Sequence, residues 1–362
     1  MCTYFWPKEK AMKRFTGVVI PARPVFDKIV ALYLYCRFTV TKLEDLNLVL
    51  SGEFQPEQSQ IDEWQRDRMF IIDIGPYKYQ VAGKGSATEI VAETLKVRSH
   101  RLIPLVAICN ENNETGGLKG LPYSLVWLLR EMYKQGYAPM TVISRIFRVI
   151  DAYVNSIGKE LKVPVDRRHP DVQTLVQHLG NHESPWCMAG YIRNLMITGA
   201  TDSEILREAR WWREVFAKCK AANEVAKDKA IDILDHKDTT KFVFKSSGRD
   251  QRGVLIHTDD TRVPRALLND GRVDLIIVVS RSKRIVILTS NRVQPRINLN
   301  RLYDVIIATE SAYRTDGRDA KDLWFYDTRI NAILNGSGGA RNTTPTGRRA
   351  ETFIDLVKET IR

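Results

Sequence analysis

The sequence predicts an α/β protein, with a parallel sheet near its start, a helical middle section and a smaller α+β region at its end. Short apolar runs at 18–20, 46–50 and 70–74 alternate with helical patterns at 26–38 and 87–96. This alternation predicts a parallel sheet, because parallel strands must be joined by a crossover, usually a helix. The chain of 362 residues is long enough for two or three domains, each with its own core.

Changes in pattern divide the chain into three expected regions. We expect an α/β domain at 14–120, a helical section at 121–236 and a basic α+β domain at 240–362. The first region should close with an exposed loop at 109–120, where the sequence is polar and rich in glycine. The remaining expected elements are helices 123–135 and 141–156, strand 254–257, helix 262–268, strands 273–280 and 285–290, and helices 299–313 and 350–361.

The clearest single element is a long helix over 203–233. Thr201 and Glu204 form a capping-box pattern at its start. Its apolar positions alternate steps of four and three, a heptad seam in which Asn223 is the polar member. Two interpretations stay open. The helix packs against its own middle section, or it pairs with a second copy of the chain to form a homo-oligomer, with Asn223 fixing the register.

The composition is that of a globular protein without a membrane-spanning segment. Hydrophobic residues make up 44% and charged residues 27% of the chain. No apolar run approaches the ~20 residues that cross a bilayer, and the first residues lack the apolar stretch of a secretory signal. The five cysteines are scattered and form no Cys-x-x-Cys pair, which favours reduced thiols. We therefore expect a cytoplasmic protein with no membrane partner.

Positive charge gathers towards the end of the chain. The net charge is +12, and from residue 237 onward there are 23 Lys and Arg against 15 Asp and Glu. No acidic residue lies between Leu275 and Tyr303. Such basicity favours a nucleotide or nucleic acid as partner, because neutralising phosphates releases counterions. A solvated basic surface without a ligand is the alternative.

The basic residues expected to face phosphates lie on or near a hairpin whose turn is at 280–284. They are Arg281, Lys283, Arg284, Arg292 and Arg296. Few aromatic residues accompany them along the sequence, so the pattern does not indicate stacking of single-stranded bases.

Two segments of the first region carry a more specific signal. Residues 24–29, Pro-Val-Phe-Asp-Lys-Ile, follow the first apolar run. Residues 70–75, Phe-Ile-Ile-Asp-Ile-Gly, are followed at 84–89 by Lys-Gly-Ser-Ala-Thr-Glu. Together they resemble the DHH-type phosphoesterases, and within them the MYG-like metal-dependent hydrolases. The resemblance implies a DHH-like N-terminal α/β domain and a smaller C-terminal domain that closes over a metal site and holds the substrate.

The resemblance also implies a metal site in which strand-end carboxylates and histidines hold manganese, which makes hydroxide from water. The family's ligand positions match Asp27 and Asp73 here, and Asp151 on a later helix is the nearest candidate for a third. The family's Asp-His-His motif falls on Gln80-Val81-Ala82, and its first histidine falls on Pro21. The proline, valine and alanine that replace the histidines have side chains with no lone pair to offer a metal. We therefore expect no cofactor, or a weakly bound manganese or magnesium ion.

Two glycine-rich stretches are candidates for phosphate binding. The first comprises Gly83, Lys84 and Ser86 before an expected helix, whose N-terminal amides favour an anion. The second comprises Gly338, Gly339 and Arg341, in a segment that the resemblance places near the substrate. The second stretch can equally be a flexible loop before the last helix.

These observations leave three hypotheses. We favour a catalytically degenerate DHH-like homologue that binds a nucleotide or nucleic acid in an interdomain cleft without cutting it. The second is an active metal-dependent phosphoesterase or nuclease with a reduced carboxylate site. The third is a structural subunit that assembles through the 203–233 helix. The first predicts salt-dependent binding that survives chelation, whereas the second predicts activity that Asp73→Ala abolishes.

Overall fold

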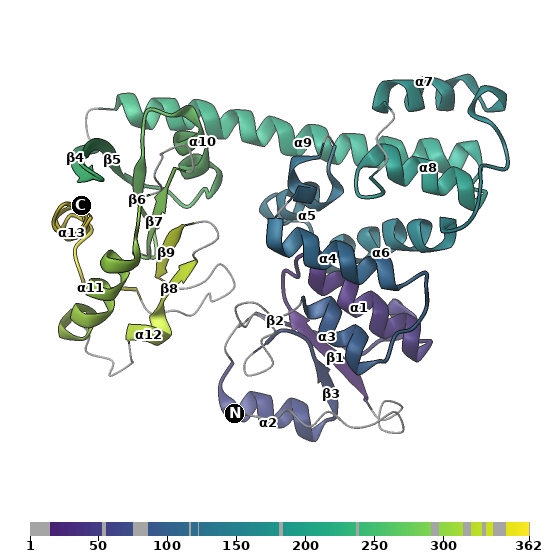
Figure 1. The fold of residues 1–362 in the computed structure, drawn as a ribbon, viewed down its shortest axis with the longest axis horizontal. Helices are drawn as coiled ribbons and strands as arrows, with labels where there is room; N and C mark the ends of the chain where they lie inside the picture. Colours follow the sequence, from purple (N-terminus) through teal and green to yellow (C-terminus); the bar gives the residue numbers. More distant parts are fainter. Residues whose placement is uncertain are drawn as a thin grey trace. The chain divides into compact units, whose positions relative to one another are not determined.

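The structure is a computed structural model, and it forms two compact units, Met1–Cys219 and Lys220–Arg362 (Figure 1). The residues it describes are 15–52, 56–74, 86–115, 117–121, 123–180, 184–236, 239–290, 297–313, 320–327, 331–335 and 345–361. The expected regions 14–120 and 121–236 share one hydrophobic core, which runs from Val18 to Cys219. The division therefore lies inside a helix, rather than at the polar stretch after it.

A three-stranded parallel sheet opens the first unit, which confirms the prediction of a parallel sheet near the N-terminus. Its strands are β1 (Gly17–Pro21), β2 (Leu48–Ser51) and β3 (Met69–Ile71), in the order β2-β1-β3. The central strand β1 pairs in parallel with both neighbours. Because the three strands run the same way, their carboxyl ends lie together at one edge of the sheet.

Helices cover both faces of this sheet (Figure 1). They are α1 (Phe26–Thr39), α2 (Gln58–Arg66) and α3 (Ala87–Thr94). Alternate residues of a strand point to opposite faces, so Val18 joins the core with α1 and α3, whereas Val19 packs with α2. Every residue of α1 from Phe26 to Cys36 is buried. The charged side chains at the start of α1 therefore lie inside the protein.

The middle of the first unit is helical, as expected. Its helices are α4 (Ile103–Thr115), α5 (Leu125–Lys134), α6 (Pro139–Ser156), α7 (Pro170–Leu179) and α8 (Met188–Thr198), with short 3₁₀ turns at Leu43–Asp45, Gly117–Gly120 and Val165–Arg167. The prediction of an exposed loop at 109–120 is wrong, because α4 continues to Thr115. Cys109 and Asn112 lie one helical turn apart and are both buried, so tertiary packing outweighs the polar sequence.

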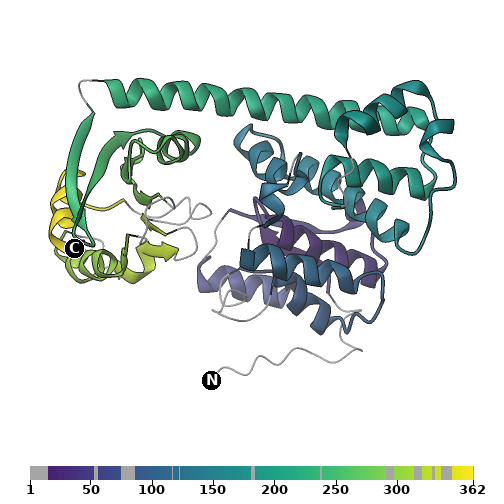
Figure 2. The ribbon, with the colours of Figure 1, turned by 45° about the horizontal axis from the view of Figure 1, so that its top comes forward.

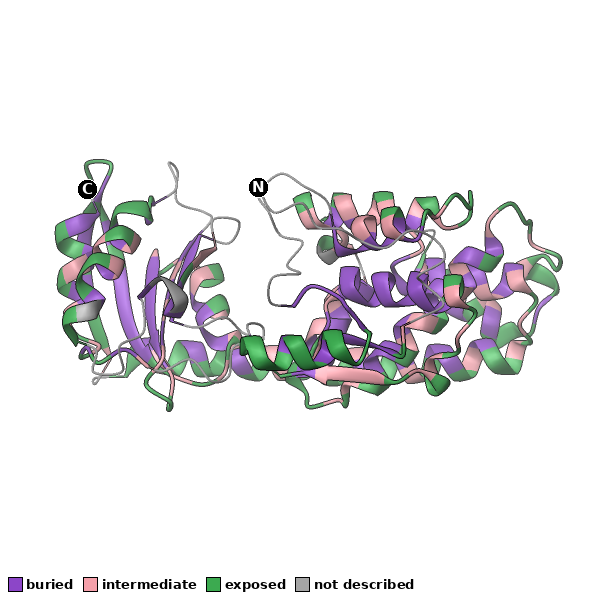
Figure 3. Cartoon of the chain, turned by 90° about the horizontal axis from the view of Figure 1, so that it is seen from below, coloured by how far each residue is buried: buried purple, intermediate pink, exposed green. Residues whose placement is uncertain are grey.

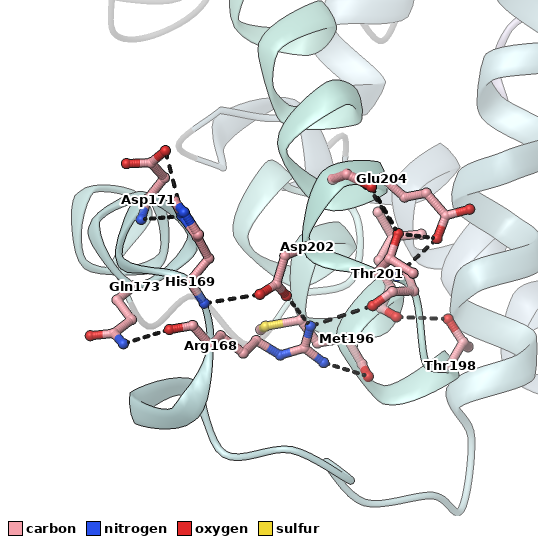
Figure 4. A network of polar contacts seen from close by, with 12 residues as sticks. Arg168, His169, Asp171, Gln173, Met196, Thr198, Thr201, Asp202 and Glu204 are labelled. Atoms are coloured by element: carbon pink, nitrogen blue, oxygen red, sulfur yellow. Dashed lines mark hydrogen bonds and ion pairs between the residues drawn. The ribbon is translucent and has the colours of Figure 1, made fainter.

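The long helix α9 (Asp202–Asp235) begins at a network of polar contacts (Figure 4). The Arg168 guanidinium donates to Asp202 Oδ1 at 2.7 Å, and the His169 amide donates to Asp202 Oδ2 at 2.9 Å. The predicted capping box is confirmed, because Glu204 N donates to Thr201 Oγ1 and Thr201 N donates to Glu204 Oε2. These contacts fix where the helix starts.

The heptad seam of α9 is covered by the chain's own side chains. Trp212 and Cys219 belong to the core of the first unit. Ala226 and Ala230 belong to a cluster in the second unit. This favours the interpretation that the helix packs within its own chain, since a second copy is not needed to cover the seam. Asn223 is half-buried between these two packed stretches.

The second unit, drawn in green to yellow in Figure 2, is built on a six-stranded sheet. The strand order is β4-β5-β6-β7-β9-β8. Its elements are β4 (Thr240–Ser246), β5 (Arg249–His257), α10 (Arg262–Asp270), β6 (Leu275–Val279), β7 (Ile285–Thr289), α11 (Asn300–Glu310), a 3₁₀ turn (Ser311–Tyr313), α12 (Ala320–Leu323), β8 (Trp324–Asp327), β9 (Ala332–Asn335) and α13 (Thr352–Thr360). Among the strands that are described, β5 and β6 pair in parallel, joined through α10, and the other pairs are antiparallel. The sheet is therefore mixed, and the unit combines helices with strands, as expected for this part of the chain.

The two faces of this sheet pack differently. One face is covered by α11 and α13, whose Leu302, Ile306 and Phe353 join a core with Ile277 and Ile287 of the strands. The other face is covered by α10 and the end of α9 over strands β5 and β6. The strands are coloured as largely buried in Figure 3. No helix among the described residues is long and apolar enough to cross a membrane.

Candidate functional site

Three charged side chains meet at the carboxyl edge of the N-terminal sheet. Lys28 Nζ lies 3.0 Å from Asp27 Oδ2 and 3.1 Å from Asp73 Oδ2. All three residues are buried, with exposed fractions of 1% for each aspartate and 5% for the lysine. The structure therefore brings together the two carboxylates that the sequence predicted as metal ligands, and it places an ammonium between them.

The chain directions explain this meeting. Asp27 and Lys28 lie in the first turn of α1, which follows central strand β1, and Asp73 lies just past the end of neighbouring β3. Neighbouring parallel strands end at the same edge, so residues that follow them are close in space. Asp73 has a φ of 54°, in the left-handed region, which aspartate adopts more readily than most residues.

Asp27 also occupies the N-terminus of α3. Its Oδ2 accepts from the amide of Ala87 at 3.1 Å, and its Oδ1 accepts from the amide and hydroxyl of Thr88 at 3.0 and 2.7 Å. Ser86 caps the same helix by accepting from the Glu89 amide at 3.0 Å. The helix N-terminus that the sequence predicted as a phosphate site therefore already holds an anion, the chain's own carboxylate.

The backbone amide of Ser86 is also engaged, because it donates to Asn110 Oδ1 at 3.2 Å. The amides of residues 86 to 89 thus all have acceptors within the protein. Ser86 acts here as a helix cap. Gly83 and Lys84 lie outside the described residues.

Asp27 and Lys28 keep their charges. Burial raises the pKa of Asp27, but Lys28 and the hydrogen bonds from Thr88 outweigh it, so the pKa of Asp27 is lowered from 3.8. Burial lowers the pKa of Lys28, and the two carboxylates reverse that effect and hold its pKa above 10.5. Burial raises the pKa of nearby Cys109 well above 9.0, with the Asp27 charge adding to it. Cys109 is thus an inert thiol.

The donor set does not fit a divalent metal. A cation bound to Asp27 and Asp73 would face the Lys28 ammonium across a few ångströms of buried space, where like charges repel strongly. The third predicted ligand lies elsewhere. Asp151 Oδ1 accepts from Arg37 Nη2 at 2.6 Å and from the Tyr33 hydroxyl at 2.8 Å. In the part of the chain that is described, no three His, Cys, Asp or Glu side chains gather as a metal site.

The predicted hairpin contacts divide into two groups. Arg281, Lys283 and Arg284 lie in the turn between β6 and β7, and Arg281 and Lys283 are exposed there. The Arg281 guanidinium also pairs with Asp259 at 3.2 Å. Arg292 and Arg296 lie outside the described residues, in a segment that begins at the opposite end of β7. The five side chains therefore do not share one turn.

The second glycine-rich stretch, with Gly338, Gly339 and Arg341, also lies outside the described residues. On either side of it, Asn335 and Thr346 are described and buried. Asn335, at the end of β9, accepts from the Thr346 amide at 3.2 Å. Thr346 in turn donates to Glu310 Oε2 at 3.1 Å. The residues on either side of the stretch, Asn335 and Thr346, are thus hydrogen-bonded to each other.

A groove of about 570 Å³ lies at the amino edge of the N-terminal sheet, away from the charged cluster. Asn47, Trp64 and Arg68 are among the residues that line it. Acidic Glu63 and Asp67 also line it beside Arg66, so its charges of opposite sign are mixed. The groove therefore favours neither sign of ligand.

Sequence reasoning missed the role of Lys28, although the residue stands inside the motif that carries the resemblance. The available signal was its position directly after Asp27 at the start of a helix that is apolar on every side. A lysine in such a helix needs a buried counter-charge, and Asp73 was the nearest predicted one. Sequence reasoning also missed Thr88, because its hydroxyl comes within hydrogen-bonding distance of Asp27 only in the folded chain.

Comparisons with known proteins do not assign a family. No family model matches the chain, and no curated protein matches it. Among solved structures, the crystal structure of an uncharacterized protein from Helicobacter pylori G27 is similar at a TM-score of 0.23 and 10% identity, over 95% of this chain and 99% of that one. A likeness at this level carries no argument about function.

Proposed function

We propose that the protein is a catalytically degenerate homologue of the DHH-type phosphoesterases that binds a nucleotide or nucleic acid without cutting it. One observation carries the proposal: the Lys28 ammonium lies at 3.0 and 3.1 Å from the two carboxylates that would hold the metal. An ammonium neutralises carboxylates but has no open position to bind and activate a water. Hydrolysis by metal-bound hydroxide therefore has no support at this cluster.

The charge distribution supports the binding part of the proposal. The last third of the chain has an excess of basic residues, and Arg281 has an exposed side-chain fraction of 96%. Exposed cations bind phosphates by releasing counterions, which requires no metal. The exposed basic residues can bind a polyanion, and the Lys28 ammonium occupies the position where the family holds its metal. Together these two properties favour binding without cleavage.

The test combines metal binding, cleavage and polyanion binding on the whole chain. Manganese is titrated by calorimetry into the wild type, and a labelled oligonucleotide is followed for binding and for cleavage, with manganese and with chelator. We expect no micromolar manganese site, no cleavage, and binding that weakens with salt and is unchanged by chelator. Asp73→Asn and, as a matched control, Asp151→Asn should both leave the oligonucleotide uncut.

Manganese-dependent cleavage that Asp73→Asn abolishes and Asp151→Asn leaves intact would overturn the proposal in favour of an active phosphoesterase. A wild type that binds no oligonucleotide at low salt would overturn the binding part. The third hypothesis, a structural subunit joined through the 203–233 helix, stays a prediction. Trp212 on that helix is fully buried in the chain's own core, so a second copy would have to contact other side chains of the helix.

A further inference from the structure

One face of the second sheet carries a row of side chains that are far apart in sequence. The strand register pairs Ile256 with Val278, Val278 with Val286, Val286 with Leu334, and Leu334 with Phe325. Residues that stand directly opposite in a ladder share a face of the sheet. These five side chains therefore form one continuous apolar row across strands β5, β6, β7, β9 and β8.

Coverage of this row decreases along it. Ile256 is 2% exposed and Val278 is 8% exposed, because α10 and the end of α9 pack over them. Val286 and Leu334 are half-buried. Phe325 is 48% exposed. Among the described residues, the cluster of packed apolar side chains on this face ends at β7, so the β7–β9–β8 half of the face presents an aromatic ring to solvent.

Positive charge lies at one end of this exposed half. Arg284 directly precedes β7 and stands two residues before Val286, so side-chain alternation places it on the same face. Burial alternates in the same way, with residues 284, 286 and 288 half-buried and 285, 287 and 289 buried. Exposed Lys283 precedes Arg284. The acidic Asp327 lies on the same face at the end of β8 that is farther from Arg284. The patch therefore has a positive end and a negative end.

We infer that this half-face, defined by Val286, Leu288, Leu334 and Phe325, binds the bases of a single-stranded nucleic acid, with a base stacked on Phe325 and the backbone phosphate towards Arg284. The inference rests on the proposed function and assigns its contact surface. A single-stranded nucleic acid has charged phosphates next to bases that can stack. The protein offers a complementary pair, the cationic turn before β7 and the exposed ring of Phe325.

We infer a strand rather than a single nucleotide because the basic turn and the aromatic ring lie on different strands of the sheet. The turn with Lys283 and Arg284 adjoins β7, and Phe325 lies on β8, with β9 between them. Because neighbouring strands lie about 4.8 Å apart, a ligand that reaches both must span roughly 10 Å. The sequence did not indicate base stacking because Phe325 reaches this face only through the strand register.

The test measures fluorescence anisotropy of the whole chain with two labelled probes of equal length, an oligouridylate and an abasic oligonucleotide that keeps the phosphates. Phe325→Ala is compared with Phe38→Ala, a matched control whose aromatic ring is 45% exposed in the first unit. We expect Phe325→Ala to weaken oligouridylate binding by about 5- to 100-fold and to leave abasic binding unchanged. Phe325→Trp should retain the affinity, and Phe38→Ala should match the wild type.

Arg284→Gln separates the phosphate contact from the base contact. It should weaken both probes and lower the slope of log affinity against log salt by about 1. Melting curves of every variant confirm folding, which Phe325→Ala should retain because its side chain is largely exposed.

Three results would overturn the inference. The first is a Phe325→Ala variant that loses affinity equally for both probes, or loses none, while the wild type binds. That result would leave the proposed function standing. The second is uridine monophosphate binding as tightly as the strand. The third is a wild-type dimer that Phe325→Ala dissociates without changing either probe, which would make a second copy the occupant. A wild type that binds neither probe would instead remove the proposed function itself.

Discussion

The charged cluster of the first unit and the exposed sheet face of the second both contain groups that can bind a ligand. They differ in whether those groups are buried and paired within the chain. Asp27, Lys28 and Asp73 are buried and satisfy one another within 3.1 Å. Phe325, by contrast, is half exposed next to a basic turn. The first arrangement has internal partners for both its cation and its anions, whereas the second leaves its ring open to solvent.

The difference shows that residue type alone does not identify a site. A motif with the carboxylates of a metal site becomes a structural feature when the chain supplies the counter-ion. A buried pair of this kind is expensive to break, because removing one partner leaves an uncompensated charge in low dielectric. The Phe325 ring is largely exposed and can be removed at little cost to the fold, so it is available for binding. Stability and binding measurements should therefore respond to the two regions in opposite ways.

The largest effect is expected for Lys28→Met. The substitution leaves Asp27 and Asp73 facing each other in the core without a cation, which should lower the free energy of unfolding by about 3–5 kcal/mol. Urea unfolding of the whole chain measures it. Lys42→Met is the control, since Lys42 is exposed and its loss should change stability by less than about 0.5 kcal/mol. Equal free energies of unfolding for the two variants would show that the cluster does not stabilise the fold.

Asp27→Asn tests the anion of the same cluster and should cost about 1.5–3 kcal/mol at neutral pH, the range for a hydrogen bond to a charged group. The pKa of Asp27 is lowered from 3.8, so its contribution is complete above pH 3.8 and is lost as the pH falls through the lowered value. Wild-type unfolding free energy should therefore fall faster than that of Asp27→Asn below pH 3.8. Parallel pH profiles would contradict this.

The basic turn offers a test with no expected change in stability. Lys283→Gln should lower the slope of log affinity for an oligonucleotide against log salt by about 1, because one phosphate contact is lost. Lys358→Gln, at an exposed position of α13, serves as the matched control and should leave the slope unchanged. If both variants lower the slope equally, the basic charge acts as a diffuse field and the turn has no special place in binding.

The sequence predicted the parallel sheet, because apolar strands and an apolar helix such as α1 leave a clear pattern. It did not predict that α4 extends to Thr115, since only the packing of Cys109 and Asn112 stabilises a helix of that polar composition. At the site, Asp27 and Asp73 were found from their positions after strands. The only sequence signal for the Lys28 bridge was a lysine placed in an apolar helix. The row ending at Phe325 depends on strand register, which no local pattern encodes.

The smallest effect is expected for Asp151→Ala, and it sharpens the contrast with the buried carboxylates. Asp151 pairs with Arg37 at 2.6 Å, but both side chains are 45% exposed, so water screens the pair. The free energy of unfolding should fall by only about 0.2–1 kcal/mol, measured by urea unfolding beside Asp73→Ala. Asp73→Ala should cost several times more, because it leaves the Lys28 ammonium buried with one carboxylate. Equal losses would mean that burial does not distinguish the two carboxylates and that the predicted third ligand is as structurally committed as the cluster itself.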